Sequence, residues 1–530
     1  MNRRHISTAV VVGLLGLAGA CKDYLNVNTN PNAPESVSAN LYLPPMEHWM
    51  VTAPQYDGRF IGRYTQEWVL ANGATSLSTW DRMGYDATSD NGAEQWRDVY
   101  WSLGQNLVDM INKAEAEQRW DIAGAGYFMK AWGWLVLTDM HGEIIVKEAI
   151  DPTRSTFDYD TQDYVYTEIL RLLGVAITDL QRADGAVDQT YFGRTDHLYN
   201  GDRTKWLKMA YGLQGLALNH FSNKSTYKPA DVIAAIDKSF ASNADDALWP
   251  YPAVDPTVTD YNFWGPTRAN INNYRQTQFV VGLMNGTVFG VVDPRMSRML
   301  ALSPDGQFRG VDPTVAGYGA MATAQQPNNF FGYAGAAGAG LPSRYIFDDK
   351  SKFPFMTYSQ LQFVKAEAAY RAGDRATALA AYTNAVSSHI DFVNARNSEI
   401  NSQSATPISS AEKAAFLADS RVVPSSANQL TLTHIMSQKY IAQWAWGHNE
   451  LWMDMRRYHY TDTDPASGKQ VFPGFTPPTS TILYPDNSGK IAQRIRPRYN
   501  SEYVWNFAAL KVIGGDQLDY HTKPVWIIQP

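Results

Sequence analysis

Aromatic and polar side chains occur together in three stretches of this chain that are poor in helical pattern. Sugar rings stack their apolar C–H faces on flat aromatic side chains, while their hydroxyl groups need polar partners. This combination predicts a carbohydrate-binding surface. The predicted ligand-binding residues are Trp80 and Tyr85 in the first stretch, Tyr261, Trp264 and Arg268 in the second, and Asn329, Phe331 and Tyr333 in the third.

Other tryptophans lie in helical patterns, where core packing is the ordinary interpretation. We therefore predict core positions for Trp96, Trp101, Trp132, Trp134, Trp206, Trp444 and Trp446. The loop aromatics differ from them because they lack this periodicity. Our hypothesis is that two of the three stretches contribute to one shallow site.

Catalytic motifs are absent from the sequence. The ten histidines form no His-Glu-x-x-His pair, and neither a Gly-x-Ser-x-Gly elbow nor a phosphate-binding Gly-x-x-x-x-Gly-Lys loop occurs. We predict a protein that is not an enzyme and holds no cofactor or metal, although two acids that converge in space for glycoside hydrolysis stay possible. The charged residues of one C-terminal helix are interpreted as a structural ion-pair network: Glu450, Asp454, Arg456 and Arg457.

Composition narrows the class of protein further. The 530 residues carry a net charge of −7, 13% aromatic residues and one cysteine. A single cysteine excludes an intramolecular disulfide framework and a multi-cysteine zinc site. The acidic balance argues against nucleic acid as a partner, because phosphate binding needs a basic face. Two acidic groups, Asp158–Asp163 and Asp86–Asn91, do not complete a calcium-loop pattern and are interpreted as solvated turns.

The cysteine follows a predicted secretory signal. Arg3 and Arg4 precede about fifteen mostly apolar residues, a run too short for a spanning helix. Leu17-Ala18-Gly19-Ala20-Cys21 resembles the bacterial lipobox. The resemblance implies that residues 1–20 are a lipoprotein signal peptide and that Cys21 is lipidated, which anchors the mature chain to a membrane. The longest later apolar run, Phe279–Val292, has only fourteen residues.

Helical elements must position these residues. Residues 21–45 are rich in Asn and Pro and predict a tether. Apolar spacing predicts helices at about 93–137, 165–180, 206–221 and 432–457, and a tetratricopeptide-like helix pair at 358–390 around Gly373 and Asp374. Pro- and Gly-rich insertions are predicted at about 245–345 and 459–500. The expected fold is mostly α, a tetratricopeptide-like helical-pair core (an α-solenoid) in a single body, residues 46–530.

Several short motifs, in order, resemble the SusD/RagB-type (SusD-like) outer-membrane lipoproteins. They are Asn30-Pro31-Asn32, Leu137-Thr138-Asp139 with Gly142-Glu143-Ile144 and Glu148-Ala149, Tyr199-Asn200-Gly201-Asp202 with Lys205-Trp206, and Gln438-Lys439-Tyr440 with Glu450, Trp452, Asp454 and Arg456-Arg457. Glu143 stands where the family has Asp, and Ile145-Val146 replaces Pro-Tyr. The usual Thr-Gly-Tyr-Pro ending is Tyr458-His459-Tyr460 here.

This resemblance implies a lipoprotein on the outer membrane, facing the cell exterior. It would capture a nutrient ligand, a glycan in preference to a peptide, and hand it to a TonB-dependent outer-membrane transporter of the SusC-like type. The family's ligand residues vary, so none is carried over to this chain. A surface glycan hydrolase and an interaction scaffold without a ligand remain the alternative interpretations.

Overall fold

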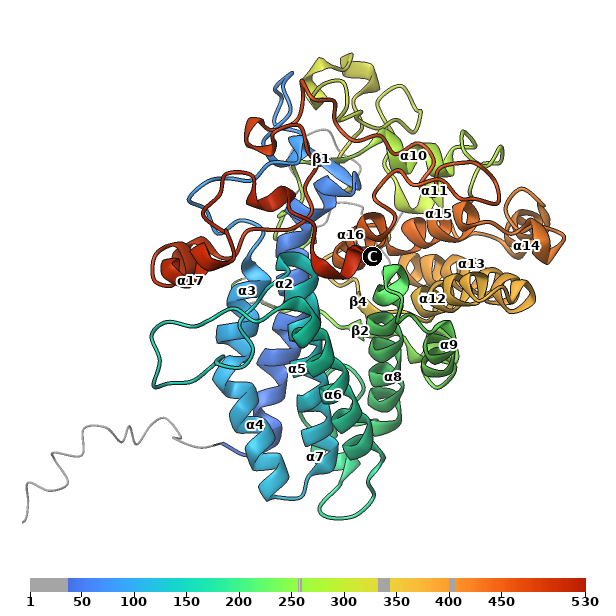
Figure 1. Cartoon of the computed structure of the whole chain (residues 1–530). Helices are drawn as coiled ribbons and strands as arrows, with labels where there is room; N and C mark the ends of the chain where they lie inside the picture. Colours follow the sequence, from blue (N-terminus) through green and yellow to red (C-terminus); the bar gives the residue numbers. More distant parts are fainter. Residues whose placement is uncertain (1–36, 256, 258–259, 332–343, 400–405) are drawn as a thin grey trace, which may run out of the picture.

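The computed structural model describes residues 37–530 except 256, 258–259, 332–343 and 400–405. Cys21, Asn30–Asn32 and Tyr333 lie outside the described residues. The fold is mostly helical, as predicted (Figure 1). The longer helices are α2 (Leu43–Tyr64), α4 (Gly104–Ala116), α5 (Trp120–His141), α6 (Gln162–Gln181), α8 (Arg203–Asn219), α9 (Pro229–Asp237), α12 (Tyr358–Arg371), α13 (Arg375–Ser398), α14 (Ser410–Ala418), α15 (Leu432–Gln443) and α16 (His448–Arg457).

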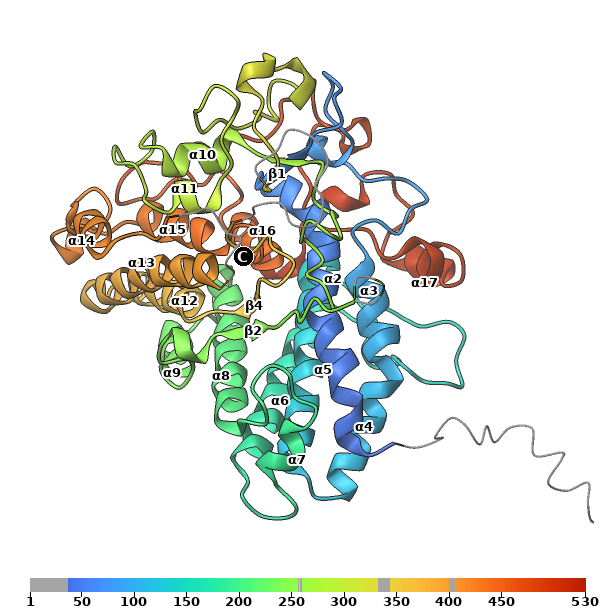
Figure 2. The same cartoon turned by 180° about the vertical axis from the view of Figure 1, so that it is seen from behind.

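These helices stack in the order of the chain. Helices α4, α5, α6, α8, α9, α12 and α13 pack each against the next (Figures 1 and 2). In the pair α12–α13, Gly373 takes the left-handed φ of +83° that ends α12, and the Asp374 side chain accepts a hydrogen bond from the Thr377 amide at the start of α13. The predicted helix pair is confirmed, including its turn.

The predicted helix at 432–457 is wrong as one helix, because the structure contains two. Residues Trp444–Gly447 separate α15 from α16, and Ala445 has a φ of +73°. The buried Glu67 carboxylate accepts a hydrogen bond from the Ala445 amide at 2.9 Å, and the Glu67 carbonyl accepts one from Trp444 Nε1. A tertiary acceptor therefore replaces the helical one, which a local pattern cannot reveal.

Helix α2 was not predicted by the sequence pattern. Pro44 and Pro45 open the helix and Pro54 lies inside it, so the stretch appears unsuitable for a long helix. Its N-terminal turn, together with the 3₁₀ helix η1 (Ala39–Tyr42), is packed into the body, and Ala39 and Leu43 are fully buried. The irregular tether predicted to reach residue 45 thus ends by residue 38.

The described residues between 245 and 345 are largely irregular. They contribute short helices, α10 (Gln278–Met284) and α11 (Met296–Met299), and two strands. Strand β3 (Tyr274–Gln276) pairs antiparallel with β1 (Trp68–Leu70), and β2 (Ala247–Trp249) with β4 (Phe353–Met356). These pairs join the insertion to the helical body. The remaining short helices are α3 (Glu94–Arg97), α7 (Gln189–Gly193) and α17 (Phe507–Val512).

Three of the four predicted residues of α16, Glu450, Asp454 and Arg457, form a buried ion-pair network, whereas Arg456 lies over the Trp452 ring at 3.9 Å and donates to the Gln493 carbonyl. Lys439 of α15 lies between Glu450 at 3.0 Å and Asp454 at 2.7 Å, and Arg457 lies 2.7 Å from Glu367 of α12. The network continues through His220, which lies 2.9 Å from Glu450. Burial lowers the pKa of His220, but the neighbouring Asp139 and Glu450 carboxylates more than offset this and raise it to about 9. The network ties together helices that are far apart in sequence.

Within the part of the chain that the structure describes, no helix combines the length and apolar character that crossing a bilayer requires.

Candidate functional site

Four of the predicted ligand-binding residues are buried in the core. Trp264 and Asn329 are fully buried, and Phe331 and Trp80 are almost so. The Trp264 ring lies 5.3 Å from Trp68 and 5.2 Å from Phe353. A ring enclosed like that of Trp264 leaves little face for a ligand, whereas Trp80, although almost buried, lines a small hollow together with Tyr85. An insertion of this length must bury its own aromatic side chains to be stable.

The remaining predicted residues do not gather at one place. Tyr261 and Arg268 are half-buried, and the Arg268 guanidinium lies 5.2 Å from the Phe263 ring. Tyr85, in contrast, is mostly buried beside Tyr484 and His521 in the C-terminal part of the chain. Tyr333 lies outside the described residues. The described residues of the three stretches thus give no shared site.

A hollow of about 380 Å³ lies instead at one edge of the helical body. This volume falls within the ~300–1,000 Å³ of ordinary small-molecule sites. We name it the Trp101 hollow, because the Trp101 side chain is 71% exposed at its rim. Its lining residues come from three segments: Trp96, Arg97, Tyr100 and Trp101; Ile145, Ala149, Ile150 and Phe157; Arg498, Ser501 and Glu502.

Two π-helical turns contribute residues to the lining of the Trp101 hollow. One is η3 (Asp98–Leu103), which carries Tyr100 and Trp101, and the other is η10 (Tyr499–Tyr503), which carries Ser501 and Glu502. A π-helical turn widens the helix by one residue and changes which side chains face outward. Such turns are rare and occur frequently at functional sites. Their meeting at one hollow supports this place as the candidate site.

Arg97 holds the exposed tryptophan in place. Its guanidinium lies 5.5 Å from the Trp101 ring and 5.3 Å from the Trp49 ring of α2. Glu94 accepts a hydrogen bond from Arg97 Nε at 2.9 Å, and the Asp98 carboxylate lies 3.1 Å from the same guanidinium. The cation is therefore compensated by carboxylates of its own chain, and its remaining role is to support aromatic rings.

The start of α3 is fixed by a buried acid of α2. The two Asp57 oxygens accept hydrogen bonds from the Glu94 and Gln95 amides at 3.0 and 2.8 Å. Burial raises the pKa of Asp57 to about 7, and it raises the pKa of the neighbouring Asp98 to about 7 as well. Asp57 contacts this wall through the α3 amides and Asp98 belongs to η3, but neither acid lines the hollow.

The second and third lining segments are tied to each other. The Asn506 side-chain amide accepts a hydrogen bond from the Phe157 amide at 3.0 Å and donates one to the Phe157 carbonyl at 2.9 Å. Glu502 accepts hydrogen bonds from the Tyr159 hydroxyl at 2.6 Å and from Asn506 Nδ2 at 3.0 Å. On the other side, the Tyr100 hydroxyl both donates to the Ile145 carbonyl and accepts from its amide. Hydrogen bonds between the lining segments thus hold the apolar side chains of the hollow in position.

The arrangement suits a ligand that has both apolar and hydroxyl-bearing faces. Trp101, Tyr100 and Phe157 offer ring surfaces, and Arg498 and Ser501 offer polar groups. Of the residues the structure describes, none form a group of three His, Cys, Asp or Glu side chains placed to hold a metal. Asp160, which the sequence placed in a solvated turn, instead accepts hydrogen bonds from the Val146 and Lys147 amides in a structural role.

The sequence prediction placed Trp101 in the core, and this is wrong. A signal was available, because Trp101 lies outside the face defined by Trp96, Val99, Tyr100 and Leu103. Residue 101 follows residue 96 by five positions, which turns an α-helix by about 140° away from that face. The position of Trp101 on the polar side of the helical pattern therefore already indicated an exposed side chain.

Known proteins with the same fold as this chain were found by comparison with family models and with solved structures. A family model described as starch-binding and associating with the outer membrane matches residues 31–475. No curated protein matches. A solved structure of a SusD/RagB family protein from Bacteroides thetaiotaomicron is 23% identical, with a TM-score of 0.69, covering 93% of this chain and 99% of that one.

Two further solved structures share the fold. A chitin-binding protein is 20% identical with a TM-score of 0.68, covering 92% of this chain and 99% of its own. A chitin-binding SusD homolog from Flavobacterium johnsoniae is 18% identical with a TM-score of 0.63, covering 92% and 97%. These likenesses confirm the predicted tetratricopeptide-like helical fold.

Proposed function

The chain belongs to the SusD-like family, and we propose that it captures a glycan in the Trp101 hollow and hands it to a TonB-dependent outer-membrane transporter. The observation that carries the proposal is the exposed Trp101 ring at the rim of a hollow of about 380 Å³. A ligand that covers the exposed ring removes apolar surface from water, which favours binding. The family description, starch-binding, agrees with an aromatic site for sugars.

Membrane attachment is the second part of the proposal. A diacylglycerol on Cys21 with a further acyl chain would hold the protein at the outer membrane without a spanning helix. Cys21→Ser is expected to release the protein from the membrane fraction, while Ser38→Ala, near the same end of the chain, leaves it bound. Membrane association of the Cys21→Ser protein would contradict the lipid anchor.

Glycan capture is tested by calorimetric titration of the purified protein with starch- and chitin-derived oligosaccharides and with a peptide mixture. Trp101→Ala is expected to weaken glycan binding at least tenfold, about 1.4 kcal/mol. Trp505→Ala is the matched control, because Trp505 is 76% exposed but lines no part of the hollow. Binding of peptides but of no glycan would contradict the sugar preference.

Hand-off to a transporter is tested by isolating the lipidated protein from its native membrane in mild detergent. We expect a large outer-membrane barrel protein to co-purify. Catalytic turnover of a bound oligosaccharide by the purified protein would instead favour a surface hydrolase, and products separated by chromatography would reveal it.

A further inference from the structure

A second, smaller hollow lies on the other side of the η10 wall. Its volume is about 160 Å³, and we name it the Tyr499 hollow. This is below the size of an ordinary small-molecule site, so it is not a complete site by itself. Its lining residues are Trp80, Tyr85, Asp86, Ala87, Thr88, Ser89, Asn91, Ile495, Arg496, Pro497, Tyr499 and Tyr503.

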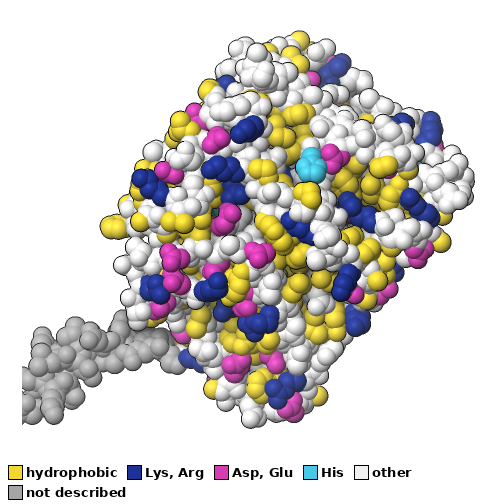
Figure 3. All heavy atoms as spheres, in the orientation of Figure 1, with side chains coloured by type: hydrophobic (Ala, Val, Ile, Leu, Met, Phe, Trp, Pro, Cys, Tyr) yellow, Lys and Arg dark blue, Asp and Glu magenta, His cyan; other side chains and the backbone are white. Residues whose placement is uncertain are grey.

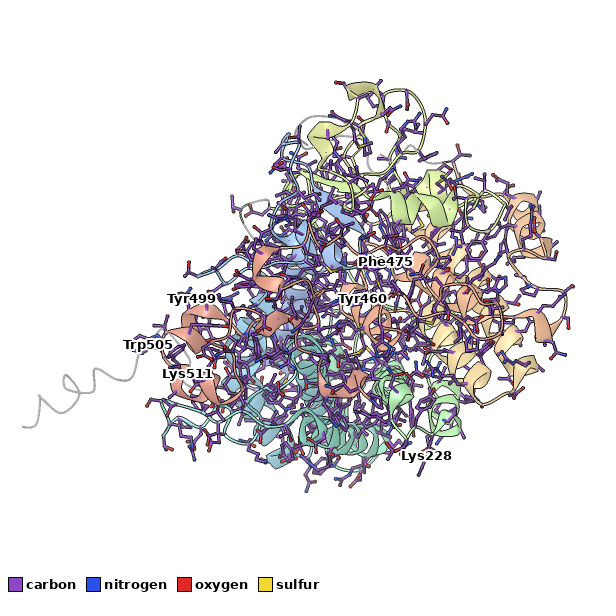
Figure 4. All side chains as sticks on the ribbon, turned by 45° about the horizontal axis from the view of Figure 1, so that its top comes forward. Lys228, Tyr460, Phe475, Tyr499, Trp505 and Lys511 are labelled. Carbon is purple, nitrogen blue, oxygen red and sulfur yellow. The ribbon has the colours of Figure 1, made fainter. Side chains whose placement is uncertain are left out.

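One segment forms a wall of both hollows. Arg498, Ser501 and Glu502 line the Trp101 hollow, whereas Arg496, Tyr499 and Tyr503 line the Tyr499 hollow. The π-helical turn η10 distributes its side chains to its two sides in this way. Figure 4 shows Tyr499 and Trp505 toward the same margin of the molecule, with Trp505 further out. The two hollows are therefore separated by the thickness of a single segment.

The ridge between the hollows is polar. Asp90 accepts hydrogen bonds from the Asn500 amide at 3.0 Å and from Asn500 Nδ2 at 2.7 Å, and its carboxylate lies 2.7 Å from Arg498. Arg498 and Asp90 are each about a quarter exposed. A ligand that crosses this ridge meets hydrogen-bonding groups that are fixed in place and whose charges are already paired with each other.

The Tyr499 hollow has the chemistry of a sugar subsite. The Tyr499 and Tyr503 rings lie nearly parallel, 5.5 Å apart at 17°. Asp86 Oδ2 accepts hydrogen bonds from Trp80 Nε1 and Asn91 Nδ2, both at 2.9 Å, while Oδ1 has no hydrogen bond to the described residues. An aromatic face beside a free carboxylate oxygen is what a hydroxyl-bearing ring needs.

The charges around the two hollows favour a neutral ligand. Arg97 and Arg498 are compensated by Glu94, Asp98 and Asp90. The guanidinium of Arg496 donates to the Gln517 and Leu518 carbonyls at 2.7 Å, and Asp86 and Glu502 add negative charge. Acidic and basic side chains are also interspersed over the face shown in Figure 3. Arg496 makes no ion pair with the described residues, but one of its terminal nitrogens is held by two carbonyls, and the Asp86 and Glu502 carboxylates repel an anionic ligand.

We propose that the two hollows are subsites of one extended site, and that a single linear, neutral oligosaccharide crosses the Asp90–Arg498 ridge to fill both. This inference rests on the proposed function and defines its ligand class. It predicts that affinity depends on chain length, because only a long chain reaches the Tyr499 hollow.

The test is a calorimetric titration with maltohexaose and N-acetylchitohexaose and with the disaccharides of each series. Tyr499→Ala is expected to weaken hexasaccharide binding at least fivefold and to leave disaccharide binding unchanged. Trp101→Ala is expected to weaken both, and Trp505→Ala neither. Thermal melting establishes that each variant is folded, and Asp86→Asn, which alters the same hollow without removing volume, provides a second variant.

The outcomes are distinct. The inference is overturned if Tyr499→Ala and Asp86→Asn leave hexasaccharide binding unchanged, or weaken both chain lengths equally. In that case, loss of binding in Trp101→Ala would still support the proposed function. If neither glycan series binds the wild-type protein, the proposed function fails and the inference fails with it. Tighter binding of an oligogalacturonate than of either neutral hexasaccharide would overturn the neutral ligand class.

Discussion

The Trp101 hollow and the 245–345 insertion contain the same kinds of side chains in opposite roles. In the insertion, Trp264 and Phe331 are enclosed, and the Phe330 ring stacks on Phe347 at 4.7 Å. At the hollow, Trp101 is mostly exposed and is supported from one side by Arg97. The irregular segment depends on burial of its aromatic side chains for stability. The helical edge is stabilised by other packed side chains, so one aromatic ring can stay exposed there. An aromatic residue in a loop is therefore not a ligand contact by default.

The largest expected effect is on stability. Trp264→Ala removes a fully buried ring and is expected to lower the free energy of unfolding by about 3–5 kcal/mol. Trp101→Ala is its counterpart and is expected to stay within about 0.5 kcal/mol of wild type. Urea denaturation followed by circular dichroism measures both. A large loss of stability in Trp101→Ala would remove the contrast between the two regions.

The next effect is the pH dependence of the free energy of unfolding, through Asp57 at the start of α3. Because burial raises the pKa of Asp57 to about 7, the folded protein binds this proton more tightly than the unfolded chain does. The corresponding stabilisation is complete below the unfolded pKa near 4 and is lost as pH rises through 7.

We therefore expect the free energy of unfolding to fall by roughly 2–3 kcal/mol between pH 5 and 8 through this group. Asp57→Asn is expected to be less stable overall, since one amide at the start of α3 loses its acceptor, but to show a flatter pH profile. Denaturation at several pH values gives the slopes. Equal slopes for the two proteins would show that Asp57 is not protonated near neutrality.

A smaller effect on glycan affinity is expected to distinguish two arginines, Arg97 and Arg59, that both lie against aromatic rings. Arg97→Gln removes the cation that supports Trp101 and is expected to weaken glycan binding about two- to fivefold, as for an exposed cation–π contact of about 0.5–1 kcal/mol. Arg59, which lies 4.1 Å from the Tyr56 ring and 5.2 Å from Phe263 of the insertion, is the matched control. Arg59→Gln should leave affinity unchanged, and titration calorimetry compares them.

The smallest expected effect tests the insertion itself. Tyr261 and Arg268 are its half-exposed members among the predicted ligand residues. Tyr261→Ala and Arg268→Ala are each expected to change glycan affinity less than twofold. If either weakened binding more than Trp101→Ala does, the ligand would lie on the insertion, and the roles of the two regions would be reversed.

Local patterns predicted the helical body well and the candidate site poorly. The pair α12–α13 follows from its own residues, because Gly373 and Asp374 form the turn between the helices. Helix α2 could not be predicted in this way, because its prolines oppose a helix that tertiary packing stabilises. The exposure of Trp101 could be predicted in part, since its position lies off the apolar face of the helix.

By itself, the sequence determined the helical-pair architecture, the ion-pair network of α16 and the family, because helix periodicity, capping residues and ordered motifs are local in the chain. It also predicts the anchor at Cys21. Only the tertiary structure decided which aromatic rings are free and that Trp101, Phe157 and Glu502 surround one hollow. Exposure is set by what other segments cover, and these three residues are brought together by contacts between segments hundreds of residues apart, which no spacing along the chain encodes.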